Sequence, residues 1–517
     1  MWTRRSILAS GAALVAVGLL PLSRAFAATD QLRVALQLEP PHLDPTAGAA
    51  SAIKEVSYQN IFEGLTSIDQ TGAVQPALAK SWTISDDGLT YVFVLQDNVR
   101  FHDGTSFDAD HVVFSLTRIT APQSENAQKA LYEVIASVIA PDPTTVKITL
   151  KHPDGDFLFN LGRGDAVIVA PESADNNKTV PLGTGPFAFV EWDQGSRVVL
   201  ERNEDYWGPH PRISGAIFLF IADPNAAINA ILANDIDGFP NFPAPEALEV
   251  FKTNPQFKVV AGTTEGETLL VTNNARKPFS DPRVRQAMAH AIDRRAIIEG
   301  AMSGYGTPIG SHFPPHNPDY VDLTGTYPFD LDAAKKLLAD AGFPNGFSTT
   351  LKLPPPSYAR RGGEVVAAQL KAIGITAQII NVEWADWLQT VFTNKDYDLT
   401  IVSHVEPNDI GVYANPNYYF GYNDPAFQAI MTKLDATADP ALRKPLLIEA
   451  QKRLADQAVN GYLFELAQVG VWNAKLEGMW VNAPVEGCVL SGIRWNEPDS
   501  GNPAPPSGPA QVPTESD

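Results

Sequence analysis

Early in the chain, apolar positions recur with the period of β-strands. Leu32, Val34 and Leu36 alternate with other residues, which is typical of a strand that is buried on one face. The runs at 82–85 and 90–95 are rich in β-branched and aromatic residues and flank an Asp-Gly pair, so they predict a hairpin. We therefore expect the first part of the chain to build sheets.

Later in the chain, apolar positions follow the helical period. Asp281 and Pro282 supply a capping carboxylate and a first-turn proline ahead of a helix. Strand-like runs at 349–353 and 375–382 enclose a helix-like run at 363–373, which predicts a βαβ unit. Further helices are expected at 108–119, 331–341 and 441–457. The fold class is therefore α/β.

The two ends of the chain differ from the rest. Arg4 and Arg5 precede an apolar run that ends in an Ala-x-Ala pattern at 25–27, which predicts a removable signal peptide at 1–27 of the twin-arginine type. An uncleaved membrane anchor is the alternative. The last residues, 497–517, contain six prolines and no aromatic residue, so we expect a disordered tail.

Composition excludes several classes of protein. The chain has 517 residues, and at about 150 residues per domain this predicts two to four domains. Its 59 acidic and 38 basic residues give a net charge of -21, the wrong sign for binding a phosphate backbone. The single cysteine, Cys488, excludes an intramolecular disulfide and a four-thiolate zinc site. The common sequence signatures of nucleotide hydrolysis, zinc proteolysis and serine hydrolysis are absent from the sequence, so an enzyme is not favoured.

One segment has the composition of a metal site. Imidazoles and carboxylates gather at His102, Asp103, Asp108, Asp110 and His111. Asp103 precedes a glycine in a turn, and Asp108 stands where the following helix needs a cap. We therefore favour a structural role for this segment and expect no metal there.

A second segment combines aromatic and acidic residues. After the βαβ unit, an apolar strand at 399–402 leads into a polar and aromatic stretch, and such strand ends are where α/β proteins place ligands. The conspicuous residues around it are Trp384, Trp387, Glu406, Asp409 and Tyr413. They are candidates for lining a cleft.

Several short motifs, in a fixed order, indicate a family. They lie at 79–82, 87–93, 99–104, 182–187, 201–207, 281–287 and 332–338. With them, the sequence resembles the extracytoplasmic solute-binding proteins of ABC importers, in the family that includes dipeptide-, oligopeptide- and nickel-binding receptors. The resemblance spans about 28–490.

The resemblance implies an architecture. Two lobes of the type II periplasmic binding-protein fold would close on a ligand, with an extra small domain on lobe one. By analogy, lobe one comprises 28–62, 181–270 and 471–496, the extra domain 63–180, and lobe two 271–470. It also implies a periplasmic location, an ABC permease as partner, a monomer and no cofactor.

The resemblance also implies site residues. In peptide-binding relatives, the place of Glu406 often carries an acidic residue for the amino terminus of the peptide. Arg360 and Arg361 offer an alternative anion clamp. The candidate ligand contacts are therefore Arg360, Arg361, Trp384, Trp387, His404, Glu406, Asp409 and Tyr413.

The function expected from this sequence is a receptor that captures a short peptide or an amino-acid-derived solute and performs no chemistry. A receptor for a nickel or other metal chelate, using His312, His316 or His404, is the nearest alternative. A secreted hydrolase with Glu406 and Asp409 as its paired carboxylates is the alternative from another class.

Overall fold

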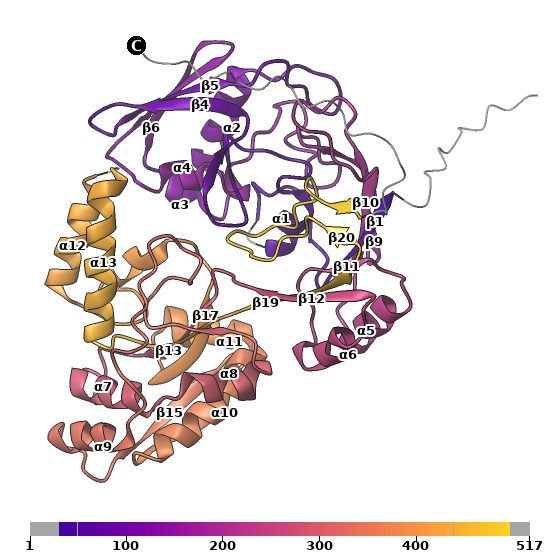
Figure 1. Ribbon diagram of the computed structural model, residues 1–517. Helices are drawn as coiled ribbons and strands as arrows, with labels where there is room; N and C mark the ends of the chain where they lie inside the picture. Colours follow the sequence, from indigo (N-terminus) through magenta and orange to yellow (C-terminus); the bar gives the residue numbers. More distant parts are fainter. Residues whose placement is uncertain (1–29, 49, 438, 497–517) are drawn as a thin grey trace, which may run out of the picture.

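The computed structural model describes residues 30–48, 50–437 and 439–496. The expected signal peptide and the proline-rich tail lie outside these residues. Within them, the chain forms two large mixed sheets and a smaller one, each covered by helices or loops (Figure 1). No helix among these residues is long and apolar enough to cross a membrane.

The first large sheet contains the first strand of the described chain and, through β19, a segment near its C-terminal end; the last strands, β20 (Leu476–Glu477) and β21 (Arg494–Trp495), pair with each other in a separate sheet. Its seven strands follow the order β12-β19-β11-β1-β10-β9-β8. They are β1 (Gln31–Leu36), β8 (Phe187–Asp193), β9 (Arg197–Arg202), β10 (Gly215–Phe220), β11 (Gly238–Phe239), β12 (Phe257–Gly262) and β19 (Gln468–Asn473). Strand β1, which the alternating pattern predicted, pairs in parallel with β10, and its Leu32 and Val34 are fully buried. Helices α1 (Ser51–Ser57), α5 (Pro224–Leu232) and α6 (Leu248–Lys252) belong to this part of the chain.

The smaller sheet has four antiparallel strands in the order β4-β5-β7-β6. They are β4 (Ala79–Ile84), β5 (Thr90–Leu95), β6 (Ile135–Asp142) and β7 (Thr145–Leu150), and β4 and β5 confirm the expected hairpin. Helices α2 (Ala109–Thr120), α3 (Lys129–Tyr132) and α4 (Phe157–Asn160) accompany this sheet, and β2 (Thr66–Ile68) pairs with β3 (Val74–Pro76) beside it.

The segment with metal-like composition is structural, as expected. Asp108 is the N-cap of α2, and its carboxylate accepts hydrogen bonds from the backbone N–H of Asp110 at 3.1 Å and contacts His111 Nδ1 at 2.7 Å. Asp103 closes a turn by accepting from the backbone of the threonine two residues on. His102 contacts the backbone oxygen of Gly185 at 3.0 Å. Each of these side chains therefore has a partner in the local fold.

The second large sheet has six strands in the order β14-β18-β13-β17-β15-β16. They are β13 (Glu267–Thr272), β14 (Thr307–Pro308), β15 (Phe347–Leu353), β16 (Ile375–Asn381), β17 (Leu399–His404) and β18 (Gly461–Glu465). Its helices are α7 (Pro282–Ala291), α8 (Arg294–Met302), α9 (Leu331–Asp340), α10 (Ser357–Lys371), α11 (Trp384–Trp387), α12 (Pro425–Asp435) and α13 (Pro440–Asp456). The predicted βαβ unit is confirmed, because β15 and β16 pair in parallel around α10.

Helix α10 begins six residues earlier than expected, at Ser357. Gly362 and Gly363 lower the helical propensity of this stretch, and the expected helix begins at the second of them. In the structure both are buried, and a Cβ at Gly363 would lie 2.4 Å from the side chain of Leu353 on β15. Close packing of the helix on the sheet therefore outweighs its low local propensity.

In the described chain, two short connections join the large sheets. Strand β12 runs into β13 through 263–266, and β18 runs into β19 through 466–467. The expected boundaries at 270/271 and 470/471 fall inside β13 and β19 respectively. The two connections lie next to each other, because β13 pairs with β18 and β12 with β19. Such a pair of adjacent strand crossings is a hinge between two lobes (Figure 1).

The sequence motifs at 182–187 and 201–207 meet at one buried carboxylate. Glu63 accepts hydrogen bonds from Thr184 Oγ1 at 2.9 Å, Tyr206 OH at 2.7 Å and Trp207 Nε1 at 2.9 Å. Burial raises the pKa of Glu63 to about 7, against the lowering effect of these three donors. A Cβ at Gly183 would lie 2.0 Å from a backbone carbonyl oxygen, so this glycine permits the close approach. These motifs therefore hold the first lobe together and do not form a ligand site.

Candidate functional site

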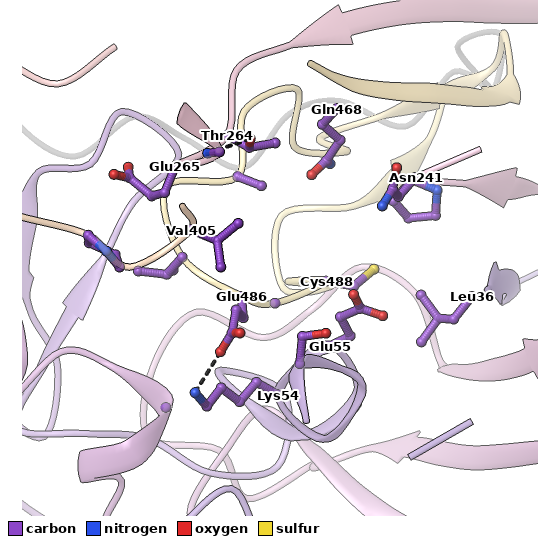
Figure 2. A pocket seen from close by; sticks show the side chains of 18 of the residues that line it. Leu36, Lys54, Glu55, Asn241, Thr264, Glu265, Val405, Gln468, Glu486 and Cys488 are labelled. Atoms are coloured by element: carbon purple, nitrogen blue, oxygen red, sulfur yellow. Dashed lines mark hydrogen bonds and ion pairs between the residues drawn. The ribbon is translucent and has the colours of Figure 1, made fainter. Parts of the chain in front are cut away.

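A cavity of about 340 Å³ lies at the hinge, between the two lobes. Its walls come from segments that are far apart in the sequence: 36–38, 51–55, 163–165, 239–241, 264–266, 405–407, 466–468 and 483–488. Figure 2 shows Lys54, Glu55 and Glu486 on one side of the space, with Glu265 and Gln468 across from them. Polar groups from both lobes therefore face one enclosed volume, as in many sites for small polar ligands.

Lys54 is the buried cation of this cavity. Helix α1 places it next to the C-terminal segment, and its side chain is only 5% exposed. Its Nζ lies 3.0 Å from Asp165 Oδ2 and 2.5 Å from Glu486 Oε2. Burial alone would lower the pKa of Lys54, but these two carboxylates hold it above its usual value. The ammonium group is therefore charged and already paired.

Arg163 connects the lobes across the cavity. Its guanidinium Nη2 lies 3.2 Å from Glu406 Oε2 on the second lobe, and its Nε lies 3.5 Å from Asp165 Oδ2. Gln128 adds a hydrogen bond of 3.1 Å from its amide to the same Glu406 oxygen. Glu406 keeps 49% of its side chain exposed, whereas Arg163 keeps 8%. Thus Glu406, which the sequence singled out, lies at the cavity and joins the second lobe to the extra domain.

Glu55 differs from the other carboxylates of the cavity. Among the described residues, its carboxylate has no hydrogen-bond or ion-pair partner, although the side chain is only partly exposed. Burial and the nearby charge of Glu486 raise its pKa to about 7. Cys488 lines the same wall, and its backbone N–H donates to the backbone oxygen of Glu55 at 3.2 Å. When the Glu55 carboxylate is ionised, no cation among the described residues balances its charge.

Glu265 lies on the hinge connection itself. Its carboxylate contacts His316 Nε2 at 2.6 Å, and both side chains are 7% exposed. Burial raises the pKa of Glu265, and the hydrogen bond from His316 opposes this effect. This pair gives the cavity a polar wall whose carboxylate already has a hydrogen-bond partner within the protein. The cavity cluster is defined as Lys54, Glu55, Arg163, Asp165, Glu265, Glu406 and Glu486.

Three of the expected contacts lie in the core of the second lobe and do not line the cavity. Asp409 Oδ1 contacts His312 Nε2 at 2.6 Å, and its Oδ2 lies 3.3 Å from His404 Nδ1. Tyr413 OH contacts His312 Nδ1 at 3.1 Å, and His404 Nε2 contacts Tyr419 OH at 2.8 Å. These five residues, here called the core cluster, satisfy one another inside the lobe. The expectation that His404, Asp409 and Tyr413 face a cleft is corrected accordingly.

Three of the remaining expected contacts, Trp387, Arg360 and Arg361, also lie away from the cavity. Trp387 is 4% exposed, and its indole N–H donates to a buried threonine hydroxyl on β17 at 2.9 Å. The side chain of Trp384 lies outside the described part of the structure. Arg360 binds Glu383 at 3.1 Å, and Arg361 is exposed on α10. Trp387 is a core residue because α11 packs its indole against the second large sheet.

The side chains named for metal binding and for hydrolysis do not come together in the arrangement that either function needs. His312 and His404 both bind Asp409, and His316 binds Glu265. In the part of the chain that the structure describes, no group of three or more His, Cys, Asp and Glu side chains is arranged to hold a metal ion. Glu406 lines the cavity, whereas Asp409 is bound to His312 and His404 in the core of the second lobe, so the two do not form the paired carboxylates of a hydrolase.

Most of the cavity cluster could not be predicted from the sequence. Lys54 and Glu55 stand in a short helix without a recognisable motif, Asp165 in a single 3-10 turn, Gly164–Ala166, and Glu486 close to the end of the described chain. These segments meet only because β19 returns to the first sheet and brings 483–488 beside α1. One available signal was a Lys-Glu pair between apolar residues of the helix 51–57.

Two lobes around a hinge, with a polar cavity at the crossing, define a two-lobed solute-binding protein. The sequence comparison agrees, because the profile of the bacterial extracellular solute-binding proteins, family 5 Middle, matches residues 73–430. The chain belongs to family 5 of the bacterial extracellular solute-binding proteins. The resemblance suggested by the motifs is thereby confirmed.

Among its relatives is the glutathione-binding protein GsiB of Escherichia coli K12, which is 34% identical over 376 residues, 71% of this chain and 72% of that protein. The fold is similar to the periplasmic binding protein DppA from Helicobacter pylori in complex with the peptide STSA, with a TM-score of 0.75, 26% identity and coverage of 90% and 98%. It is also similar to AgaA from A. tumefaciens in complex with agropinic acid, with a TM-score of 0.73, 27% identity and coverage of 91% and 100%.

Proposed function

We propose that this protein is the periplasmic receptor of an ABC importer and captures a short peptide or a related small polar solute in the cavity between its lobes. The observation that carries the proposal is the cavity itself, which has a volume of about 340 Å³ and is lined by polar and apolar groups of both lobes at the hinge. This size suits a di- or tripeptide. The relatives that bind glutathione, the peptide STSA and agropinic acid support this class of ligand.

The proposal includes the parts of the chain that surround the lobes. Export would use the twin-arginine signal at 1–27, and the mature protein would act as a monomer that delivers its ligand to a membrane permease without performing chemistry. We propose that lobe one comprises 28–62, 181–262 and 468–496, and lobe two 267–465, with the hinge at the two connections between them. The extra domain at 63–180 extends lobe one.

Two ion pairs that join the lobes would hold them in a closed arrangement. Besides the contact of Arg163 with Glu406, Arg443 on α13 lies 2.8 Å from Asp156 Oδ2 at the start of α4. At Gly155 a Cβ would lie 2.2 Å from the Arg443 side chain, so the glycine leaves room for this approach. Figure 1 shows α12 and α13 beside the extra domain at this point. A ligand that touches both lobes would stabilise this closed form by its differential affinity.

The first experiment identifies the natural ligand. The mature protein is purified from a native periplasm, and its mass is compared by native and denaturing mass spectrometry. We expect a stoichiometric small peptide or amino-acid derivative to be released intact. Recovery of a hydrolysed product from an added peptide would contradict a receptor that performs no chemistry.

The second experiment uses Cys488 as a built-in reporter. It is the only cysteine of the chain, and it lines the cavity with its thiol buried. Burial shields this thiol and raises its pKa to about 12, so we expect alkylation to be faster when the lobes open. A ligand that closes the lobes should slow alkylation of the thiol, and a panel of di- and tripeptides can be compared by this rate. Equal alkylation rates with every peptide of the panel and without peptide would contradict capture of a peptide in this cavity.

A further inference from the structure

We propose that the cavity selects ligands with a net positive charge, and that Glu55 binds an ammonium or guanidinium group of the ligand. This inference rests on the proposed receptor function and specifies its substrate class. It is carried by the charge balance of the cavity and by Glu55, the one carboxylate of the cavity cluster that has no partner among the described residues.

Carboxylates outnumber cations around the cavity. The lining residues include five acidic side chains, Glu55, Asp165, Glu265, Glu406 and Glu486, and two basic ones, Lys54 and Arg163. A site with this composition attracts cations and repels anions, and the low dielectric of a closed cavity strengthens both effects. The charge of the cavity is thus a property of its lining and not of the whole acidic surface.

Both cations are already engaged. Lys54 contacts Asp165 and Glu486, and Arg163 contacts Asp165 and Glu406. These two cations and three carboxylates form a connected network that retains one negative charge. An anionic ligand group would have to displace a carboxylate that is bound to one of them and leave it without a partner, which costs free energy in a water-poor site.

Two carboxylates lie outside that network, and they are not equivalent. Glu265 has His316 as its partner at 2.6 Å, whereas Glu55 has none among the described residues. Glu486, the nearest acidic neighbour of Glu55, points its Oε2 at Lys54. A ligand cation at Glu55 would therefore supply the missing charge and would form a charge-assisted hydrogen bond.

The rest of the lining suits an uncharged body for such a ligand. Leu36, Phe239, Val405 and Leu466 provide apolar walls, and Gln468 provides a neutral polar group. No other basic side chain lines the cavity within the described chain. The structure therefore offers one cation site and an apolar surface, and we expect it to discriminate against a second negative charge on the ligand.

Three dipeptides of matched size test the selectivity. Lys-Leu, norleucyl-leucine and Glu-Leu carry net charges of about +1, 0 and -1 near neutral pH. Titration calorimetry with the mature protein should give a Kd for Lys-Leu about tenfold lower than for norleucyl-leucine, with Glu-Leu weakest. Equal Kd values for the three dipeptides would overturn the charge selectivity and leave the receptor function intact. No binding of any of them at about 1 mM, the weak limit of specific affinity, would instead overturn the peptide receptor itself.

Glu55→Gln tests the role of the carboxylate. This variant keeps the size of the side chain and should raise the Kd for Lys-Leu about tenfold. Glu172→Gln is the matched control, because Glu172 is exposed, has no partner among the described residues and lies outside the cavity. Its Kd should equal that of the wild type. A Glu55→Gln variant that unfolds at the wild-type temperature and binds Lys-Leu with wild-type Kd would overturn the assignment of Glu55.

Discussion

Two groups of ionisable side chains, the cavity cluster and the core cluster, both contain buried carboxylates, but these carboxylates differ in how their hydrogen bonds are completed. In the core cluster, the carboxylate of Asp409 contacts the imidazoles of both His312 and His404 inside one lobe. The hydroxyl groups of Tyr413 and Tyr419 contact the other ring nitrogens of these histidines. In the cavity cluster, the partners come from both lobes and Glu55 has none among the described residues. A closed set of hydrogen bonds stabilises a fold, whereas an incomplete one at a cavity leaves affinity for a ligand. The following tests separate these roles.

The largest effect is expected for Asp409→Ala. Burial alone would raise the pKa of Asp409, but His312 and His404 hold it well below its usual value. Removing the carboxylate leaves buried imidazoles without their acceptor and should lower the free energy of unfolding by about 3 to 5 kcal/mol. Urea unfolding near pH 7 measures the loss.

Because its folded pKa is lowered, the contribution of Asp409 is present above its unfolded pKa of about 4 and is lost as the pH falls further. The difference between wild type and Asp409→Ala should therefore shrink in acid. Asp409→Asn keeps an acceptor oxygen and is the control, with a smaller loss. Wild-type stability of Asp409→Ala at pH 7 would show that the core cluster is not structural.

A second stability test concerns Glu465, which ends β18 at the hinge. It is fully buried, and its Oε2 has no hydrogen-bond partner. Burial raises its pKa to about 8. The folded protein therefore keeps a proton that the unfolded chain releases above about pH 4.3, so the stability contributed by this group falls as the pH rises from there to about 8.

Glu465→Gln should remove the decrease in stability that Glu465 causes as the pH rises from about 4.3 to about 8. Near pH 8 the variant should be more stable than the wild type by about 4 kcal/mol, and near pH 4 the two should be equal. Urea unfolding across this pH range checks the result. A constant difference at all pH values would mean that Glu465 does not change protonation on folding.

The pH dependence of binding tests the cavity cluster. Glu55 has a pKa of about 7 in the protein, and a cationic ligand favours its ionised form. Below that pH, binding must first remove a proton, so the affinity for Lys-Leu should rise about tenfold per pH unit until the pH reaches about 7. Titration calorimetry in a series of buffers measures this.

The control must show that Glu55, and not a neighbouring group, causes the pH dependence of binding. Lys54 has a raised pKa and the Cys488 thiol a pKa of about 12, so both keep their protonation state in this range. Glu55→Gln should flatten the profile, and Glu172→Gln should retain it. A profile that Glu55→Gln leaves unchanged would assign the pH dependence to another group.

The smallest effect on the fold is expected for Glu406→Ala. Its side chain is half exposed and joins the lobes through Arg163 and Gln128. The variant should raise the Kd for Lys-Leu about threefold and change the free energy of unfolding by less than about 0.5 kcal/mol. An unchanged Kd would remove Glu406 from the site, and a large loss of stability would make it a structural residue like Asp409.

The local pattern of the sequence predicted the elements well. The alternation around Leu32, the Asp-Gly hairpin, the cap at Asp108 and the βαβ unit at 349–382 are confirmed, because each depends on neighbours within a few residues. The start of α10 was wrong, since packing against Leu353 decided it. The family motifs indicated the fold and the class of protein, and the resemblance based on them predicted Glu406 as a ligand contact.

The sequence could not separate the two clusters. Glu406 and Asp409 are three residues apart in one loop, yet one lines the cavity and the other is buried in the lobe. Glu55 was indistinguishable from an exposed helical glutamate until β19 brought Glu486 and Cys488 beside it. The sequence by itself determined the elements and the family. Only the tertiary structure decided which carboxylates have partners, because that depends on segments hundreds of residues apart meeting at the hinge.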